Sequence, residues 1–444
     1  MSNTAILNAN HAQQLIERHF SVSQGQLCVG RLPISELVDT HGTPLYIYDR
    51  SVLEQQLSAL ENALSPRFDI YYSIKANPNQ EILKFFVGRG CGLEIASGGE
   101  LHQALQAGCP SESILFAGPG KSDDELEYAL ASDIGEIHVE SIDEAKRISQ
   151  LSRRPAKTQR IALRINPSGE AQGGAMRMGG LPSPFGIDEE QLDEVVKYVA
   201  NDSQLDLVGV HLFTGTQILD HNVLATQYRH AVALARRVAK QLKKPLETID
   251  FGGGLGIPYF KHEAPLDLDA FGGEAALIIE EIDNDPLLSG ARLLVEPGRF
   301  LVGEAGIYVS RVTGIKESCE KTFLMIDGGM HHHLAASGNL GQTIKRNYPV
   351  ALVNKLNEPD TTTVDVVGPL CTPLDVLARG VSLPQAEVGD LFAVFQSGAY
   401  GRSASPLGFL SHSSPPEIWV DGEAHRAIRR RGTLTDSLHD QQQA

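Results

Sequence analysis

The stretch ILFAGPGKSDDELEYALASDIGEIHVES, residues 114–141, contains one complete period of the fold. The apolar runs at its two ends (114–120 and 135–141) finish in glycine or serine, which is typical of buried parallel strands. The segment between them opens with Ser122 and carries Glu125 three residues later, the capping-box pattern of a helix start. The stretch therefore predicts a strand, a helix and a second strand.

The same alternation continues through most of the chain. Amphipathic stretches such as DEEQLDEVVKYVA (188–200) lie between apolar runs, as expected for helices that cover a sheet. The strand-like runs lie at 68–76, 92–97, 114–120, 135–141, 160–167, 205–215, 246–254 and 291–299. Eight strand–helix repeats in about 230 residues favour a closed (β/α)8 TIM barrel over an open, doubly wound sheet. We expect an α/β protein whose barrel occupies residues 50–305.

After the barrel the pattern changes to strand-like runs separated by turns, with few long helices. Examples are GIYVSRVTGI, TFLMID, TTTVDVVGPL, DLFAVFQSG and PEIWVDG. They predict a C-terminal, mostly antiparallel β domain at residues 306–432. The run PLYIYD (44–49) precedes the barrel, and we expect the segment 21–49 to join this β domain. The polar ends, residues 1–20 and 433–444, are expected to be mobile.

Composition excludes several classes of protein. The chain of 444 residues has 38 Lys+Arg against 55 Asp+Glu, a formal net charge of −17, which argues against binding to nucleic acid or to an anionic membrane surface. No apolar run reaches the roughly 20 residues of a membrane span, and the N-terminus lacks the pattern of a signal peptide. The five cysteines include no CxxC pair and are too few for a disulfide scaffold. We therefore expect a cytoplasmic protein with reduced thiols.

Chemistry in a TIM barrel is placed where its strands end, at the C-terminal face. Lys75 ends the first run, Gly252-Gly253-Gly254 end the seventh, and Glu296 and Arg299 end the eighth. Consecutive glycines let backbone N–H groups approach an anion, so the run is a candidate phosphate site, although a flexible corner of the barrel would look the same. Lys75 could be an ordinary solvated lysine, or an amine that condenses with a carbonyl.

Together these groups fit pyridoxal phosphate. This cofactor needs a lysine for its aldehyde, a site for its phosphate and a partner for its pyridine nitrogen. Glu296 could be that partner, because a carboxylate beside the ring nitrogen favours the protonated pyridine, the stronger electron acceptor. The alternative is that Glu296 only pairs with Arg299.

Eight motifs in this order carry a resemblance: YYSIKANPN, GLEIASGGEL, GVHLFTGTQ, DFGGGLG, EPGRF, DGGM, GPLCTPLD and SGAYG. Over residues 43–420 the chain resembles the fold-type III pyridoxal-phosphate decarboxylases, which include diaminopimelate, ornithine and arginine decarboxylases. The resemblance implies an alanine-racemase-like barrel with a β domain. It also implies a head-to-tail homodimer in which each active site is completed by the partner subunit.

The resemblance assigns roles to individual residues. Lys75 would hold the cofactor as a Schiff base, and Cys371 would reach across the dimer interface as the proton donor. Glu296 would face the pyridine nitrogen. The other residues expected near the cofactor are Arg164, Phe213, Thr216, Gly252, Gly253, Gly254, Arg299 and Tyr400. Contacts to the substrate are expected from Arg299, Thr372, His332 and Arg346.

Three departures from the family pattern narrow the substrate. Phe213 stands where the family usually has a histidine stacked on the cofactor ring; it can stack but cannot donate a hydrogen bond. Thr372 replaces the acid that holds the distal ammonium in diamino-acid decarboxylases, and a buried ammonium without a carboxylate is unfavourable. The Arg-x-x-x-Tyr segment of diaminopimelate enzymes is missing after DGGM. Free diaminopimelate, ornithine and lysine are therefore less expected as substrates.

The motifs DGGMHHHLAAS, RNYP, RMGGLPSPFG and FLSH are most similar to a smaller branch of the family. That branch includes a butirosin-pathway decarboxylase that acts on a glutamyl unit held on an acyl carrier protein, with related branches in siderophore pathways and exosortase-associated gene clusters. The basic run Arg429-Arg430-Arg431, with Lys345 and Arg346, could dock such an acidic carrier, although a solvated surface run is the simpler interpretation.

The histidine run His331-His332-His333 is a weak metal candidate, since neighbouring residues of a strand point to opposite faces. We expect no metal site, and we expect these histidines to shape the substrate entrance. Cys28, Cys91, Cys109 and Cys319 are interpreted as packing thiols.

The sequence predicts a pyridoxal-phosphate-dependent decarboxylase that removes the α-carboxylate of an amino-acid unit, free or bound to a carrier protein. The first alternative is meso-diaminopimelate decarboxylase of lysine biosynthesis. A racemase is less expected, because racemases of this fold place an arginine at the pyridine nitrogen, where this chain has Glu296. An inactive relative that binds the cofactor and regulates a partner is the alternative from another class.

Overall fold

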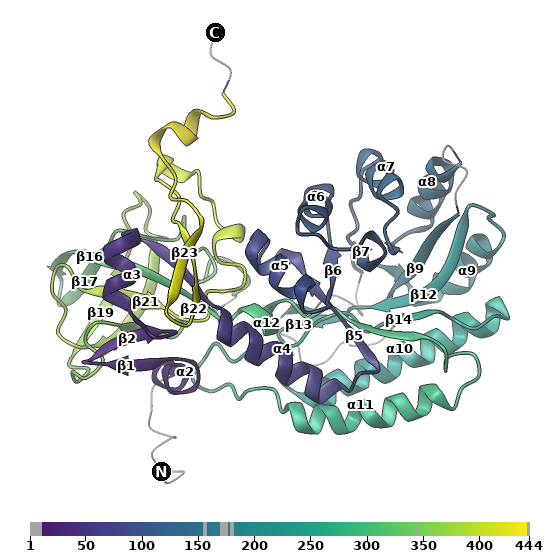
Figure 1. Cartoon of the computed structure of the whole chain (residues 1–444), viewed down its shortest axis with the longest axis horizontal. Helices are drawn as coiled ribbons and strands as arrows, with labels where there is room; N and C mark the ends of the chain where they lie inside the picture. The colour runs from purple at the N-terminus through teal and green to yellow at the C-terminus, as the bar shows by residue number, and fades with distance from the viewer. Residues whose placement is uncertain (1–10, 154–157, 169–175, 178–181, 343, 442–444) are drawn as a thin grey trace. The chain divides into compact units, whose positions relative to one another are not determined.

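The computed structural model describes residues 11–153, 158–168, 176–177, 182–342 and 344–441 (Figure 1). The chain divides into two compact units. The barrel unit consists of Leu57–Ile257 and Ala264–Phe300, and the β unit consists of the N-terminal part through Gln56, the short segment Pro258–Glu263, and the chain from Leu301 onward. Within the described ranges, every helix is too short or too polar to cross a lipid bilayer.

The barrel unit contains a ring of eight parallel strands. Each strand pairs with the next one along the chain, and pairing of β15 with β5 and of β8 with β9 closes the ring. The strands are β5 (Phe68–Ser73), β6 (Gly92–Ile95), β7 (Ile114–Phe116), β8 (Glu136–Val139), β9 (Gln159–Asn166), β12 (Leu205–Leu212), β14 (Thr248–Asp250) and β15 (Arg292–Val295). Seven of them lie inside the predicted runs and β9 begins one residue before its run, so the predicted (β/α)8 barrel is confirmed.

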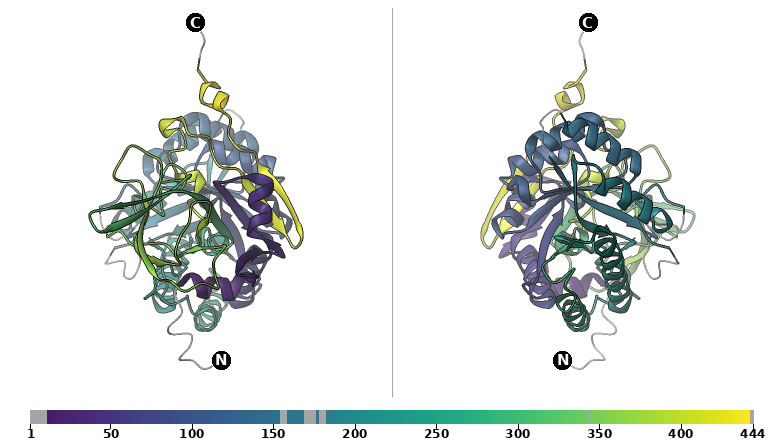
Figure 2. Two further views of the ribbon diagram at one scale, coloured as in Figure 1. Left: turned by 90° about the vertical axis from the view of Figure 1, so that its left-hand side faces the viewer. Right: turned by 90° about the vertical axis from the view of Figure 1, so that its right-hand side faces the viewer.

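Helices surround the strands of the barrel, as the right-hand view of Figure 2 shows. Several begin on a serine cap within a few residues of a strand end: Ser97 accepts from Glu100 N, Ser122 forms the predicted capping box with Glu125, and Ser141 accepts from Glu144 N. These short strand-to-helix turns bring the strand ends and the helix N-termini to one face of the barrel. The helices are α4 (Arg50–Leu64), α5 (Gln80–Gly88), α6 (Gly98–Gln106), α7 (Asp123–Ser132), α8 (Ile142–Ser152), α9 (Leu192–Ala200), α10 (His221–Leu242) and α11 (Leu268–Asp283).

The β unit has a sheet that is mostly antiparallel, as predicted, with parallel pairing between β17 and β19 and between β4 and β22. The predicted strand PLYIYD forms β4, which lies between β16 and β22. The strands are β4 (Leu45–Asp49), β16 (Gly306–Ser318), β17 (Lys321–Ile326), β18 (Val350–Leu352), β19 (Thr362–Val367), β20 (Val376–Leu383), β21 (Leu391–Val394), β22 (Glu417–Asp421) and β23 (Ala424–Arg429). β18, β20 and β23 had no clear strand pattern because each is short or interrupted by arginine or glycine.

The N-terminal part of the β unit differs from the expected mobile end. His11–His19 form helix α2, whose Ala12, Leu15 and Ile16 are buried in the core of this unit. A small sheet of β1 (Ser21–Ser23), β2 (Gln26–Val29) and β3 (Leu32–Pro33) follows, and then helix α3 (Ile34–His41). The polar composition of residues 1–20 concealed an apolar helix face of three residues. Residues 1–10 lie outside the described part.

The C-terminal end also carries structure. Leu434–Leu438 form the short helix η6, capped by Thr433. The Arg430 guanidinium pairs with Asp436 in its first turn, at 2.7 Å. Residues 433–441, expected to be mobile, are therefore fixed in part by a capping box and an ion pair.

Candidate functional site

Lys75 lies in a single 3-10 turn, η1 (Ile74–Ala76), directly after β5. Its Nζ is 3.2 Å from both carboxylate oxygens of Glu94, which is 1% exposed in β6. Ser73 Oγ donates to the same carboxylate. The Lys75 side chain remains 44% exposed, so its amine is both oriented and accessible. Glu94 was not among the predicted site residues, although an acid inside the apolar run GLEIAS is an unusual feature.

Arg299 lies next to this turn. It opens the short helix α12 (Arg299–Val302), and the preceding turn packs against the one that carries Lys75. A Cβ on Gly298 would stand 3.0 Å from Ala76 Cβ, and Ser73 N donates to Pro297 O at 3.3 Å. The ends of the first and eighth barrel strands are thus held together.

The glycine run packs between the ends of β12 and β15. Gly252 has a φ of +66°, which favours glycine, and its N–H donates to Asp250 Oδ1 at 2.7 Å. A Cβ on Gly253 would stand 2.5 Å from Glu296 O. Next to the run lies β13 (Gly215–Thr216), and Ile218 N donates to Gly254 O at 2.9 Å. The predicted phosphate residues, Thr216 and the three glycines, are therefore neighbours.

Phe213 lies near Lys75, and Arg164 lies near Phe213. The Phe213 ring centre is 5.9 Å from Lys75 Nζ and 5.8 Å from Arg164 Cζ, and Arg164 also lies 5.2 Å from the Phe185 ring. Such distances are within range of cation–π attraction. Both cations thus lie near one flat aromatic ring, which offers a planar ring a surface on which to stack.

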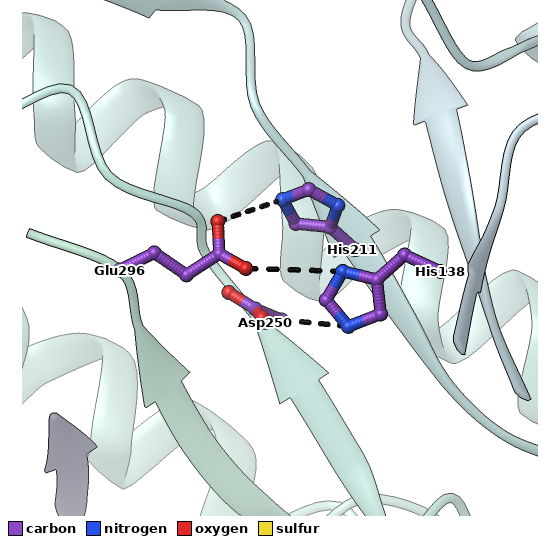
Figure 3. A group of neighbouring side chains, drawn as sticks. All are labelled: His138, His211, Asp250 and Glu296. Atoms are coloured by element: carbon purple, nitrogen blue, oxygen red, sulfur yellow. Dashed lines mark ion pairs between the residues drawn. The ribbon is translucent and has the colours of Figure 1, made fainter. Parts of the chain in front are cut away.

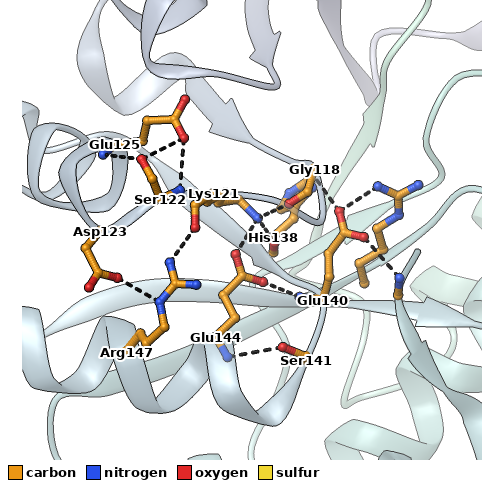
Figure 4. A network of polar contacts seen from close by, with 12 residues as sticks. Gly118, Lys121, Ser122, Asp123, Glu125, His138, Glu140, Ser141, Glu144 and Arg147 are labelled. Carbon is orange, nitrogen blue, oxygen red and sulfur yellow. Dashed lines mark hydrogen bonds and ion pairs between the residues drawn. The ribbon is translucent and has the colours of Figure 1, made fainter. Parts of the chain in front are cut away.

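Arg164 is buried and is held by Glu140. Its Nη1 is 2.7 Å from Glu140 Oε1, and that carboxylate also accepts the N–H groups of Gly118 at 2.8 Å and Gly186 at 3.0 Å. Glu140 N in turn donates to Glu144 Oε2 at 2.7 Å. Figure 4 shows Glu140 and Glu144 side by side in this network.

A buried ammonium completes the network of Figure 4. Lys121 is 4% exposed and donates three hydrogen bonds of 2.7–2.8 Å, to Gly118 O, His138 O and Glu144 Oε1. Burial lowers the pKa of Lys121, and the adjacent Glu144 carboxylate opposes this shift. The ion pair between Lys121 and Glu144 thus links the ends of β7 and β8 to Glu140, the residue that holds Arg164.

Glu296 belongs to a second buried cluster, with His138, His211 and Asp250 (Figure 3). Glu296 Oε2 is 3.3 Å from His211 Nε2, and its Oε1 is 3.8 Å from His138 Nδ1. The other ring nitrogen of His138 is 3.7 Å from Asp250 Oδ2. Each of the four residues lies at or directly after the end of a different barrel strand.

Burial controls the protonation of this cluster. It lowers the pKa of His138 and His211 well below the usual range, so both imidazoles are neutral. Burial, and next the charge of Glu296, raise the pKa of Asp250 well above its usual range. Apart from Glu296, these residues were not predicted; a polar residue at the end of each apolar run (GEIHVES, GVHLFTG, TIDFGGG) was the available signal.

The histidine run of the β unit is packed in its interior. His332 Nδ1 lies 3.1 Å from Tyr308 Oη, and His333 Nε2 lies 2.9 Å from Ser397 Oγ. His331 lies against His332 and His412, with ring centres 3.7 and 4.8 Å away. Among the described residues, the group that could converge on a metal ion is the Glu296 cluster, not this run. The role of His332 toward substrate stays a prediction.

Cys371 lies exposed in a tight loop of the β unit and forms no disulfide. The buried Asp375 holds this loop: it accepts Met330 N at 2.6 Å and Leu370 N at 2.9 Å. Thr372 Oγ1 accepts Leu374 N at 3.3 Å. Tyr400, also in this unit, is half-buried with a φ of +53°. Cys371, Thr372 and Tyr400 belong to the β unit, whereas Lys75 belongs to the barrel unit.

The basic residues suggested for carrier docking have partners inside the β unit. Arg429 pairs with Glu417, Arg430 pairs with Asp436, and Arg431 donates to His41 O and Pro44 O. Lys345 Nζ donates to Asn339 Oδ1, and Arg346 lies 5.1 Å from the Phe260 ring. These contacts weaken the hypothesis that the basic residues dock a carrier protein, because local contacts within the β unit account for their presence.

The barrel residues fit pyridoxal phosphate. Glu296 Oε1 is buried and has no hydrogen-bond partner among the described residues, as expected of an oxygen reserved for a protonated ring nitrogen. The amine of Lys75, the ring of Phe213 and the side-chain-free surface of the glycine run supply the other required contacts.

Comparison with known proteins supports this fit. Residues 50–303 match the family model described as the pyridoxal-binding domain of pyridoxal-dependent decarboxylases. The chain is 38% identical to the L-glutamyl-[BtrI acyl-carrier protein] decarboxylase of Niallia circulans, over 92% of this chain and 96% of that protein. It is 34% identical to the diaminopimelate decarboxylase of Methanothermobacter thermautotrophicus, over 94% of this chain and 96% of that protein.

A solved structure extends the likeness to three dimensions. The diaminopimelate decarboxylase of M. jannaschii in complex with L-lysine superimposes with a TM-score of 0.88 at 26% identity, covering 96% of this chain and 98% of that one. The family match spans more than half of the chain, and the sequence relatives span nearly all of it. The chain therefore belongs to the pyridoxal-dependent decarboxylases, carboxy-lyases that use pyridoxal phosphate.

Proposed function

We propose that this protein removes the α-carboxylate of an amino-acid unit whose distal end carries no free ammonium, as in a glutamyl unit held on an acyl carrier protein. The observation that carries this proposal is the Cys371 loop. Its acidic residue, Asp375, already accepts two backbone N–H groups and is 2% exposed. Thr372 is neutral and is bonded within its own loop. A distal ammonium would therefore find no available carboxylate in this loop.

In this proposal the barrel residues hold the cofactor. Lys75 binds its aldehyde, Thr216 and the glycine run bind its phosphate, Phe213 covers its ring, and Glu296 keeps its pyridine nitrogen protonated. The bound cofactor supplies an acceptor for the electron pair that remains when CO2 departs. Arg164, Arg299 and Tyr400 line the cofactor and substrate. Burial of Glu296 excludes water from its contact, which strengthens its electrostatic effect.

Cys371 Sγ is the proposed proton donor to the α-carbon, supplied by the partner subunit of a head-to-tail homodimer. Exposed apolar side chains support a contact surface at this loop: Leu374 is 49% exposed, Ile344 72% and Leu340 39%. Asn339 Nδ2 donates to Leu374 O at 3.3 Å, so the two exposed segments are adjacent. Apolar surface around a reactive thiol is expected where a second subunit covers it.

Release of CO2 from a panel of substrates tests the proposal. Purified protein would be given free meso-diaminopimelate, ornithine, lysine and L-glutamate, and L-glutamate loaded on an acyl carrier protein. We expect the highest kcat/KM with the carrier-bound unit. Fastest turnover of free meso-diaminopimelate would instead support the second candidate function, which the 34% identical relative favours.

A Lys75→Ala variant is the control for this assay. It should lose the absorption band of the covalently held cofactor and all CO2 release. If the band persists, the assignment of Lys75 is wrong. If wild-type protein holds the cofactor but releases no CO2 from any substrate, the inactive regulatory relative becomes the better interpretation.

A further inference from the structure

The function proposed above uses Glu296 but not the three residues that contact it. The rings of His138 and His211 are tilted by 35° with centres 4.4 Å apart, and the four residues of the cluster are 0–6% exposed. None of the four ring nitrogens has a hydrogen-bond partner among the described residues, and three of them face the carboxylates at 3.3–3.8 Å. Two buried imidazoles without other partners are costly for a fold, so their position needs a reason.

The distances within the cluster single out one neighbour of Glu296. Asp250 Oδ1 accepts Gly252 N–H at 2.7 Å, and its Oδ2 lies 3.7 Å from His138 Nε2. His138 Nδ1 lies 3.8 Å from Glu296 Oε1, which is longer than a hydrogen bond. His211 Nε2 lies 3.3 Å from Glu296 Oε2, the shortest of these separations.

We propose that His211 is a positioning residue, whose Nε2–H holds Glu296 in the orientation that meets the pyridine nitrogen of the cofactor. His138, at the longer distance of 3.8 Å, is the weaker second support. The backbone couples the same carboxylate to the phosphate site, because Glu296 N donates to Gly252 O at 2.8 Å. The inference rests on the proposed role of Glu296.

A metal ion is the other occupant that such a cluster could suggest. The arrangement disfavours it, because His138 directs both of its ring nitrogens at different carboxylates, and one imidazole offers only one nitrogen to an ion. Asp250 is also committed to the Gly252 N–H. The structure therefore favours a hydrogen-bonded support over a metal centre.

A chemical double-mutant cycle tests the positioning role without relying on activity. Apoenzyme would be titrated with pyridoxal phosphate and with its deaza analogue, in which C–H replaces the ring nitrogen. His211→Met removes the donor at nearly constant size, and His211→Gln retains a donor at the position of Nε2. A hydrogen bond to a charged group corresponds to about 10-fold or more in affinity. The affinity of His211→Met apoenzyme for pyridoxal phosphate should therefore fall by that factor. It should change the affinity for the analogue less than about twofold.

The controls separate this inference from the function on which it rests. His211→Gln should restore most of the affinity for pyridoxal phosphate, and His102→Met, at an exposed histidine of the same unit, should affect neither ligand. Glu296→Gln should lower the affinity for pyridoxal phosphate more than the affinity for the deaza analogue. If both affinities change equally, the pyridine nitrogen lies elsewhere and the proposed role of Glu296 fails.

If Glu296→Gln affects the two affinities differently but His211→Met lowers both affinities equally, His211 has only a structural role and the inference is overturned. Stoichiometric metal in the purified protein, lost in His211→Met, would also overturn it.

Discussion

Glu136 begins strand β8 and is 2% exposed, yet it bears a carboxyl group. Thr248 Oγ1 donates to its Oε2 at 3.0 Å, while the nearest guanidinium nitrogen, on Arg160, is 3.8 Å away. Burial raises the pKa of Glu136 to about 7, against this partial compensation. The group is a stability determinant with no part in the proposed chemistry.

Glu136 should make the protein less stable as the pH rises from about 4.5 to 7. Below this window both states are protonated; within it only the unfolded chain ionises, so folding takes up a proton and stability falls by about 1.4 kcal/mol per pH unit. Glu136→Gln removes the ionisation. We expect its Tm relative to wild type to rise between pH 5 and pH 7.5.

The matched control is Glu247→Gln, at a half-exposed carboxylate that pairs with the same Arg160. Its Tm relative to wild type should vary little with pH over this range. A Tm difference for Glu136→Gln that stays constant with pH would show that the carboxyl is ionised in the folded protein.

At the scale of elements, the glycine run joins two strand ends. The test is Gly253→Ala, because the new Cβ would stand 2.5 Å from Glu296 O. The backbone must shift, so the affinity for pyridoxal phosphate should fall by at least about 10-fold while the barrel stays folded. Gly273→Ala, in helix α11 with nothing within 4 Å, should leave affinity unchanged. Equal affinity of the two variants would mean that the run has room for a side chain.

The loop that carries Cys371 is the second element to be tested, through Asp375, the residue that holds it in place. Asp375→Asn removes the charge that attracts the Met330 and Leu370 N–H groups, so the loop should loosen. We expect kcat to fall about 10-fold with unchanged cofactor affinity, and Cys371 to react faster with a thiol reagent. Unchanged kcat and thiol reactivity would show that other contacts fix the loop.

At the scale of the whole molecule, the proposed dimer makes a quantitative prediction. Lys75→Ala and Cys371→Ala each remove one half of a shared site. Subunits mixed in equal amounts and allowed to exchange should regain about a quarter of wild-type activity, because half of the dimers are hybrids and each hybrid has one intact site. Each variant alone is the control. No recovery after demonstrated exchange would place both residues in the same subunit's site.

The residues that mark the cofactor class were recognisable along the chain. Lys75, the glycine run and Glu296 each follow an apolar run directly, and the closed ring of eight parallel strands brings such positions to one face. Phe213 and Arg164 came from the family resemblance, and the structure places Phe213 near Lys75 and Arg164 near Phe213. The termini were misjudged, because three apolar residues in α2 and one capping box in η6 are weak signals in polar segments.

The sequence alone determined the period of the barrel and the family, since alternating apolar runs and ordered motifs are local properties. Only the tertiary structure decided which polar residues meet. His138, His211, Asp250 and Glu296 come from four strands, and closure of the ring brings their ligand atoms within 4.8 Å of one another. Glu94 reaches Lys75 because β5 and β6 are parallel neighbours in register. Such contacts depend on strand order and register, which no single run of residues encodes.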